Sequence, residues 1–212
     1  MPYFLRLSAL GLLVLPTAAI AAQPPMPNKW DTSSRSVIMH NDLPIICDDP
    51  AINAKNYLLS VEPAFTIAMS WQATVNPADQ STSTVAASQQ GYGGTVAAGF
   101  TDFRYNSPYF WESYGTIVDA DIYMNYDLLY WPGTTDVKKS YDLWCSSSYQ
   151  GSFTIYNVDY QSAFLHEMGH VLGMDHRTDG ATGPCVMHAQ LPRGTTRWAF
   201  CADERTAYTG AY

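Results

Sequence analysis

Alternation of apolar and polar positions predicts strands in the first two-thirds of the chain. Residues 34–41 (SRSVIMHN) alternate in this way and form the first strand candidate. Two further candidates are 95–105 (TVAAGFTDFRY) and 116–126 (TIVDADIYMNY). Between the first strand candidate and these two, the period of the apolar residues changes, because Phe65, Met69 and the pair Gln72–Ala73 recur at helical spacing. Residues 61–75 are therefore predicted as a helix, with Pro63 tolerated in its first turn.

Stretches without either period predict loops. Residues 76–94 are rich in Ser, Thr, Gly and Gln, and residues 23–34 form a Pro-rich lead-in. The region between 126 and the later histidines is rich in Tyr, Trp and Gly and is predicted to be irregular.

A second helix is better defined and covers residues 160–172 (YQSAFLHEMGHVL). Asp159 can cap its start, because a carboxylate can accept hydrogen bonds from the exposed N–H groups of the first turn. Gly173 is suited to the left-handed conformation that stops a helix. Residues 202–212 (ADERTAYTGAY) predict a short closing helix.

Residues 1–22 (MPYFLRLSALGLLVLPTAAIAA) have the layout of a secretory signal peptide. One basic residue, Arg6, precedes an apolar run from Leu7 to Leu15, and small residues follow. A membrane anchor needs about 20 apolar residues, and this run is about half as long. Cleavage after Ala21 or Ala22 is therefore expected. The mature chain, residues 23–212, is expected to be an exported, extracellular or periplasmic, single domain.

The composition and charge of the chain limit the domain number and the classes of partner that are expected. About 190 of the 212 residues remain after cleavage, which suits one domain with a single core. The formal net charge of -8 argues against nucleic acid or an anionic membrane as a partner. Charged and aromatic residues each make up 14%, as in secreted, strand-rich globular proteins. No later stretch is long and apolar enough to span a membrane, and a monomer is expected.

The four cysteines are Cys47, Cys145, Cys185 and Cys201. An even number in an exported protein indicates two disulfides, and the sequence leaves three pairings open. Cys185–Cys201 with Cys47–Cys145 is favoured, because the first pair closes a compact C-terminal loop. A zinc–thiolate site is disfavoured, since no two cysteines have CxxC spacing.

Three of the five histidines fall within HEMGHVLGMDH, residues 166–176. His166 and His170 are four residues apart and share one face of the predicted helix, so both can bind one ion. Gly173 lets the chain turn, so that His176 approaches from outside the helix. Three imidazoles from two directions predict a tetrahedral metal with one open corner, and zinc is the expected ion.

Glu167 indicates what the metal is for. Beside the first histidine, it is expected to point toward the open corner, where it can take a proton from metal-bound water and return it to a leaving amine. A structural zinc site would close that corner with another Cys or His. The alternatives are a helix whose histidines bind no metal and a zinc site that has lost its activity.

Together, HEMGHVLGMDH and the following CVMHAQ resemble the metzincin zinc metalloproteases of the matrixin-like type. The resemblance implies that His166, His170 and His176 bind zinc and that Glu167 is the catalytic base. It also implies that Met187 is the Met-turn residue, which forms an apolar floor beneath the metal.

Weaker similarity extends over most of the mature chain. KWDTSSRSVIMHN is similar to the first strand of matrixin-like domains, IVDADIYMN to a strand of their bacterial forms, and ADERTAY to their closing helix. The resemblance therefore implies an α+β zincin fold. It would have a twisted, mainly parallel sheet with an antiparallel edge strand and about three helices, among them the active-site helix and the C-terminal helix.

Three features depart from the family pattern. Ala189 stands where astacins and serralysins have a tyrosine, and Arg177 follows the last ligand in place of the usual Ser, Asp, Glu or Pro. No histidine lies between His40 and His166, so only one zinc is expected. His188 is expected to pack in its loop, with substrate contact as the alternative.

Latency and calcium have little support in the sequence. Residues 23–34 contain no cysteine that could block the zinc ion before activation. Two less favoured alternatives are that the Cys47 thiolate blocks the zinc ion or that Asp31 binds it as an inhibitory ligand. The acidic pair Asp48–Asp49 lacks the ligand spacing of a calcium loop.

The function expected from this resemblance is that of a secreted zinc endopeptidase acting on a protein or peptide substrate. Glu167 would activate the zinc-bound water, and the substrate would lie extended along an edge strand, either 95–105 or 116–126. Two alternatives remain: a zinc amidase acting on cell-wall peptides, and a non-proteolytic secreted effector or binding protein that keeps the scaffold.

Overall fold

Strands and helices follow one another along the chain in a computed structural model that describes residues 29–32, 34–40, 43–72, 84–88, 98–106, 116–129 and 142–212. The predicted signal peptide lies outside the described residues. The strands are β1 (Lys29–Trp30), β2 (Ser34–His40), β3 (Thr66–Gln72), β4 (Thr84–Ser88), β5 (Gly99–Asn106), β6 (Thr116–Asn125), β7 (Leu143–Trp144) and β8 (Val158–Asp159). The helices are α1 (Asp48–Val61), α2 (Tyr126–Leu129), α3 (Ser147–Gln150), α4 (Tyr160–Val171) and α5 (Ala202–Ala211), and a 3-10 turn covers Ile45–Cys47.

The main sheet is parallel except at one edge. Its path runs β1-β6-β4-β2-β3 with parallel pairing throughout, and β5 pairs with β6 in the antiparallel direction. The predicted α+β class and the antiparallel edge strand are confirmed. The expectation that 116–126 could be an edge is wrong, because β6 pairs with β5 on one side and with β1 and β4 on the other.

The predicted helix over 61–75 is wrong, since residues 66–72 form strand β3 and the helix lies earlier, as α1. Helix α1 buries Ala51, Ala54 and Leu58, which recur at helical spacing. Asp48 and Asp49, considered above only as calcium ligands, occupy its first turn, where their charge favours the helix dipole. The strand was missed because a few apolar residues fit both periods at this length.

Two smaller predictions also fail. The predicted loop 76–94 contains strand β4, and the region predicted to be irregular contains α2, α3 and the small parallel sheet of β7 and β8. With α2 and α3, the described residues form five α-helices in place of the expected number of about three. Both discrepancies involve elements of five residues or fewer, which carry too few positions to establish a period.

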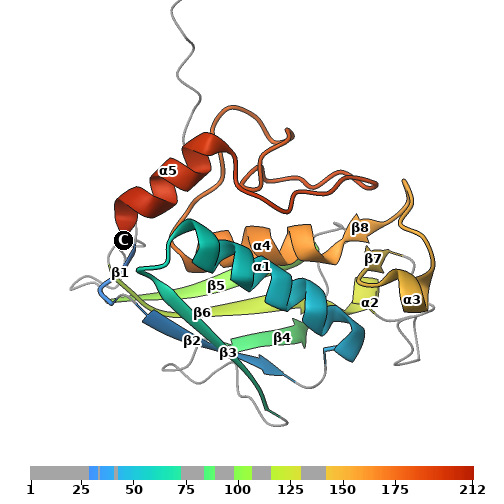
Figure 1. Ribbon diagram of the computed structural model, residues 1–212, viewed down its shortest axis with the longest axis horizontal. Helices are drawn as coiled ribbons and strands as arrows, with labels where there is room; N and C mark the ends of the chain where they lie inside the picture. Colours follow the sequence, from blue (N-terminus) through green and yellow to red (C-terminus); the bar gives the residue numbers. More distant parts are fainter. Residues whose placement is uncertain are drawn as a thin grey trace, which may run out of the picture.

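Helices α1 and α4 lie side by side on one face of the main sheet (Figure 1). Phe164, Leu165 and Met168 of α4 are fully buried in the core, together with Ile122 and Met124 of β6. Because α4 is enclosed between the sheet and the C-terminal residues, most of its side chains are buried. The helix is thus held rigidly, and it carries three of the predicted site residues.

The two ends of the described chain meet at the end of α4. Trp30 Nε1 donates a hydrogen bond of 2.7 Å to the Val171 carbonyl, and the Tyr212 hydroxyl donates one of 2.8 Å to the Leu172 carbonyl. These carbonyls have no partner within the helix, so the contacts satisfy groups that a helix end leaves open. The last turn of α4 is therefore fixed by residues 141 and 40 positions away in sequence.

Two disulfides join distant parts of the fold. Cys47 bonds to Cys145, and Cys185 bonds to Cys201, which is the pairing that the loop argument favoured. Neither the zinc–thiolate alternative nor a blocking Cys47 thiolate is compatible with these bonds. Such disulfides are typical of proteins from oxidising compartments. Among the described residues no helix is long and apolar enough to cross a bilayer.

Candidate metal centre

Helix α4 begins and ends as the sequence predicted. The Asp159 carboxylate accepts a hydrogen bond of 2.8 Å from the Ser162 N–H at the N-cap. The helix ends beside Gly173, whose φ of 92° lies in the left-handed region that favours glycine. Within the helix, His166 and His170 are one turn apart and their Nε2 atoms lie 3.1 Å from each other.

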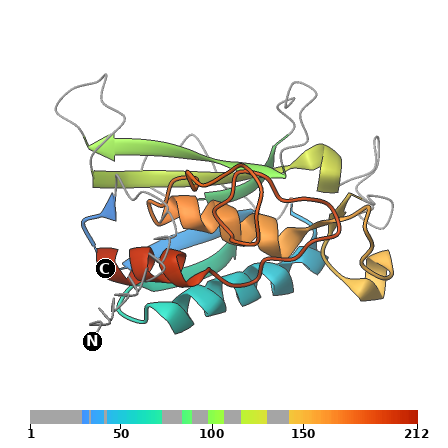
Figure 2. The ribbon, with the colours of Figure 1, turned by 90° about the horizontal axis from the view of Figure 1, so that it is seen from above.

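The third histidine arrives from the segment that follows. After Gly173, residues 173–201 contain no helix or strand, and in Figure 2 this stretch (orange to red) loops over α4. It brings His176 Nε2 to 3.2 Å from His170 Nε2 and 3.3 Å from His166 Nε2. The three predicted ligands therefore meet at one point.

Hydrogen bonds to carbonyl oxygens orient two of the rings. His166 Nδ1 lies 2.8 Å from the Val186 carbonyl, and His170 Nδ1 lies 2.7 Å from the Met174 carbonyl. Because a carbonyl only accepts, each Nδ1 must carry the proton, and each Nε2 lone pair is directed at the common point. Burial lowers the pKa of His166 to about 3 and that of His170 to about 4. Both rings are therefore neutral at neutral pH, the form that binds metals.

The three Nε2 atoms fit a metal ion. Ligand nitrogens 2.0–2.1 Å from a tetrahedral zinc lie about 3.3–3.4 Å apart, and the observed separations are 3.1–3.3 Å. His166, His170 and His176 can thus bind one ion. Within the described part of the chain, no fourth His, Cys, Asp or Glu joins this group, which leaves a coordination position for a substrate or water.

Glu167 is buried beside the histidines, with 5% of its surface exposed. The Thr101 hydroxyl of β5 donates a hydrogen bond of 2.7 Å to Glu167 Oε2, and a Cβ at Gly99 would approach the Glu167 Cγ to 3.2 Å. Burial raises the pKa of Glu167 to about 7, and the Thr101 bond opposes that shift. A carboxyl group with this pKa can both accept and donate a proton near neutral pH.

Glu167 and all three histidines line one cleft of about 930 Å³. Ala98, Gly99 and Thr101 form part of its wall, so the edge strand β5 borders the histidine cluster. The 173–201 segment supplies another part of the wall, including Leu191 and Arg197. His188, expected to pack in its loop, is 4% exposed and also lines this cleft.

Met187 is fully buried against α4. Its sulfur occupies the space that a Cβ at Gly169 would fill, and Gly169 lies between His166 and His170 on the helix. The Met187 carbonyl accepts a hydrogen bond of 3.0 Å from the Arg177 N–H, directly after the last ligand. Met187 therefore packs against the turn of α4 that carries both helical histidines, and its backbone is hydrogen-bonded to the residue after the third ligand.

A network of buried charges holds the turn that contains Met187. The Glu204 carboxylate of α5 accepts hydrogen bonds from the N–H groups of Val186 (3.2 Å), Met187 (2.7 Å) and Cys201 (2.9 Å). The Arg177 guanidinium lies 3.8 Å from this carboxylate. It also bonds Asp203 and Asp179, each at 2.6 Å. Arg177, the position that departs from the metzincin pattern, thus joins the last predicted ligand to α5.

Sequence reasoning missed Thr101, Arg197 and Glu204. Thr101 lies in a predicted strand, but nothing in the sequence shows which helix that strand faces. Glu204 was visible only as part of a closing helix. Its role as a hydrogen-bond acceptor is seen only in the fold, where α5 lies against the 173–201 segment.

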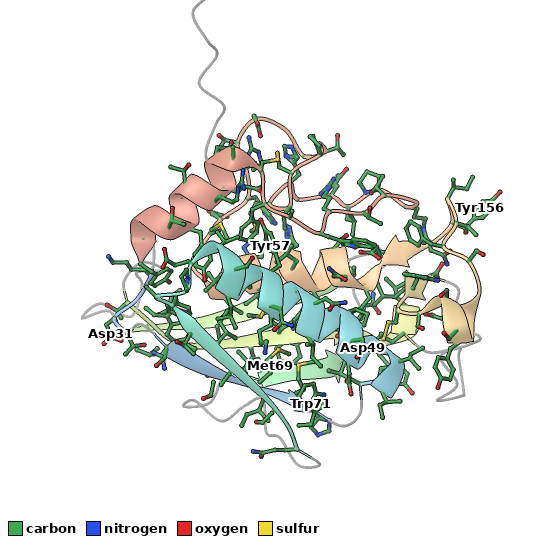
Figure 3. All side chains as sticks on the ribbon, in the orientation of Figure 1. Asp31, Asp49, Tyr57, Met69, Trp71 and Tyr156 are labelled. Atoms are coloured by element: carbon green, nitrogen blue, oxygen red, sulfur yellow. A yellow bond between two sulfur atoms is a disulfide. The ribbon has the colours of Figure 1, made fainter. Side chains whose placement is uncertain are left out.

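Asp31, considered above as an inhibitory ligand, lies 3.9 Å from Arg35 beside β1, and Figure 3 shows it at the edge of the molecule. It is not part of the histidine group.

The comparisons with known proteins do not identify a family for this chain. No family model matches the chain, and no match was found among the curated proteins.

Proposed function

We propose that this chain is an exported zinc-dependent endopeptidase of the metzincin type. The observation that carries the proposal is the convergence of three Nε2 atoms at 3.1–3.3 Å, with a buried carboxyl group in the same cleft. The ring tautomers, the open coordination position and the methionine packed under α4 all agree with the motif HExxHxxGxxH.

His166, His170 and His176 hold the zinc ion. When bound, zinc supplies Lewis-acid chemistry, because it polarises a carbonyl group and makes water more acidic. Calcium is not part of the proposal, since Asp48 and Asp49 serve the first turn of α1.

Glu167 moves the proton. Its carboxylate accepts a proton from the attacking water and then donates it to the nitrogen of the leaving amine, so that the peptide bond is hydrolysed to a carboxylic acid and an amine. Thr101 fixes one carboxylate oxygen through its 2.7 Å hydrogen bond. The other oxygen is then the one that takes up and releases the proton.

The substrate lies extended along β5. This strand pairs with β6 on one side only, within the residues that the structure describes, and it borders the cleft. An open strand edge offers backbone N–H and C=O groups to an added peptide strand. The cleft then receives the side chains next to the bond that is cut.

The test uses the full chain exported by an expressing cell, with the mature N-terminus read by mass spectrometry. An N-terminus near residue 23 would agree with the predicted signal peptide. Cleavage of a denatured protein and of a quenched peptide library is compared between wild type, Glu167→Gln and the surface variant Glu62→Gln. Glu167→Gln is expected to lower kcat/KM about 10²–10⁴-fold with one zinc per chain retained.

The controls separate the other functions. Glu62→Gln should cleave as wild type does, and a chelator should abolish cleavage until zinc is restored. Equal cleavage by Glu167→Gln would overturn the assigned role of Glu167. Cleavage of peptidoglycan fragments alone would indicate an amidase, and a biological effect that survives Glu167→Gln would indicate a binding protein.

A further inference from the structure

Two buried arginines lie near the candidate centre, and they differ in their partners. Arg177 and Arg197 are 7% and 6% exposed. Arg177 is neutralised by Asp179 and Asp203, each 2.6 Å from its guanidinium. Arg197 has no carboxylate within 4.0 Å among the described residues. Within the described part of the chain, Arg197 is therefore a buried guanidinium with no carboxylate in contact, and Glu204 attracts its charge only from beyond that distance.

The partners of Arg197 are carbonyl oxygens. Its side chain donates hydrogen bonds to the Gln190 carbonyl at 2.7 Å and to the His188 carbonyl at 3.5 Å. A guanidinium has five N–H donors, so two acceptors leave some of them for another group. These carbonyl groups orient the planar guanidinium group but do not neutralise its charge.

Arg197 lies in the wall of the cleft, close to the predicted ligands. Its backbone N–H donates to the Ser162 hydroxyl at 2.6 Å, which places it one helical turn before His166. Other parts of this wall are small or apolar, including Val158, Ala163 and Leu191. Its guanidinium has little contact with water, and this burial lowers the pKa of Arg197, while Glu204 opposes the shift.

The cleft has opposite charges near the two ends of α4. Arg197 contacts Ser162 in the first turn, whereas Asp175 follows the end of the helix and lines the same cleft. His166 and His170 lie between these two positions along the helix. An acidic group entering the cleft is therefore attracted toward the Arg197 end and repelled from the other.

We propose that Arg197 binds a carboxylate of the substrate, so that the cleft selects peptides with Asp or Glu close to the bond that is cut. This specificity rests on the proposed endopeptidase function. An arginine guanidinium and a carboxylate form two parallel hydrogen bonds, and the substrate would supply the contacting counter-ion that Arg197 lacks among the described residues. A neutral side chain of the same shape would leave the buried guanidinium unpaired, which is costly.

A carboxylate can come from a side chain or from the C-terminus of a peptide. The experiment therefore uses sets of quenched peptides that differ at one position on either side of the cut, carrying Glu, Gln, Leu or Lys. Each set is made with a free and with an amidated C-terminus. Wild type is expected to prefer Glu over Gln at one position by at least about 10-fold in kcat/KM. A preference that depends only on the free C-terminus would assign the carboxylate to the chain end.

The variants are Arg197→Gln, Arg197→Lys and Arg205→Gln. Arg197→Gln should abolish the Glu preference, and Arg197→Lys should keep part of it, because a lysine retains the charge but not the planar fork. Arg205 is exposed on α5, so Arg205→Gln removes the same charge from the surface and should keep the preference. Thermal unfolding and zinc content confirm that each variant is folded.

A binding measurement separates this inference from the proposed function. Glu167→Gln loaded with zinc is titrated with the Glu and Gln peptides, with and without Arg197→Gln. Tighter binding of the Glu peptide that depends on Arg197 supports the inference even where wild type cleaves nothing. Equal cleavage and equal binding of Glu and Gln peptides by a folded, zinc-loaded protein would overturn it.

Discussion

Helix α4 and the 173–201 segment contribute to the same centre, but they hold their residues in different ways. In α4, the spacing of His166 and His170 follows from backbone hydrogen bonds, and the helix is fixed by packing against the sheet and α1. The 173–201 segment has no helix or strand. His176 and Met187 are held there by a disulfide, a buried carboxylate and hydrogen bonds to carbonyl groups.

The packed layer also supports the irregular segment. The N–H of Phe200 donates a hydrogen bond of 2.6 Å to the Tyr57 hydroxyl of α1, and Figure 3 shows Tyr57 directed toward that segment. Arg197 and Ser162 provide a similar link from α4. The comparison teaches that a helix can position two ligands by itself, whereas the third depends on a few polar contacts. Loss of one such contact should therefore affect metal binding more than a similar loss of core packing.

The largest expected effect is that of Glu204→Ala. This change leaves the N–H groups of Val186, Met187 and Cys201 without their acceptor and removes a buried charge beside Arg177. We expect a loss of about 3–5 kcal/mol in the free energy of unfolding. The affinity for zinc should also fall, which competition with a chelating dye would measure.

Leu58→Ala is the matched control for this change. Leu58 is fully buried in α1, so its truncation should cost about 2–5 kcal/mol. Because Leu58 makes none of the polar contacts that hold the 173–201 segment, the folded variant should bind zinc as wild type does. Equal zinc affinity in both variants would show that the Glu204 contacts do not position the third ligand.

A smaller effect is expected from Gly169→Ala, which acts where the two regions touch. The added Cβ would overlap the Met187 sulfur, so the methionine must move. We expect a cost of about 1–3 kcal/mol, partly offset because alanine favours helices more than glycine. Gly210→Ala in α5 is the control, since its added Cβ meets no atom within 4 Å.

Denaturant unfolding of both glycine variants would measure this difference. A double variant with Met187→Ala should lose less stability than the two single changes added together, because the overlap is then relieved. Additive losses would mean that the two regions are not coupled through this contact.

The smallest effect is expected from Asp179→Asn, at the exposed side of the Arg177 cluster. Arg177 lowers the pKa of Asp179 by hydrogen bonding, so the charged form is favoured in the folded state. The stabilisation is therefore present above the unfolded pKa, about 4, and is lost as the pH falls through the lower folded value. The variant should have a lower Tm than wild type at pH 7, and the difference should shrink as the pH falls. A Tm difference that grew toward low pH would contradict this sign.

The sequence predicted the part of the site that depends on local structure. The four-residue spacing of His166 and His170, the Asp159 cap and the Gly173 stop are all local, and all three are observed. The favoured disulfide pairing is also present, because Cys185 and Cys201 are only 16 residues apart and the second pair then follows. Elsewhere the pattern was too short or too mixed, as in the strand β3 that was predicted as a helix.

Only the tertiary structure decided what surrounds the histidines. Thr101 reaches Glu167 across 66 positions, and the Glu204 carboxylate reaches Met187 across 17. Arg197 became informative when the fold buried it in the cleft, where its side-chain partners among the described residues are carbonyl groups. A sequence states which groups are charged or can form hydrogen bonds. Whether each group finds a partner depends on which distant segments pack together, because burial removes the water that would otherwise satisfy it.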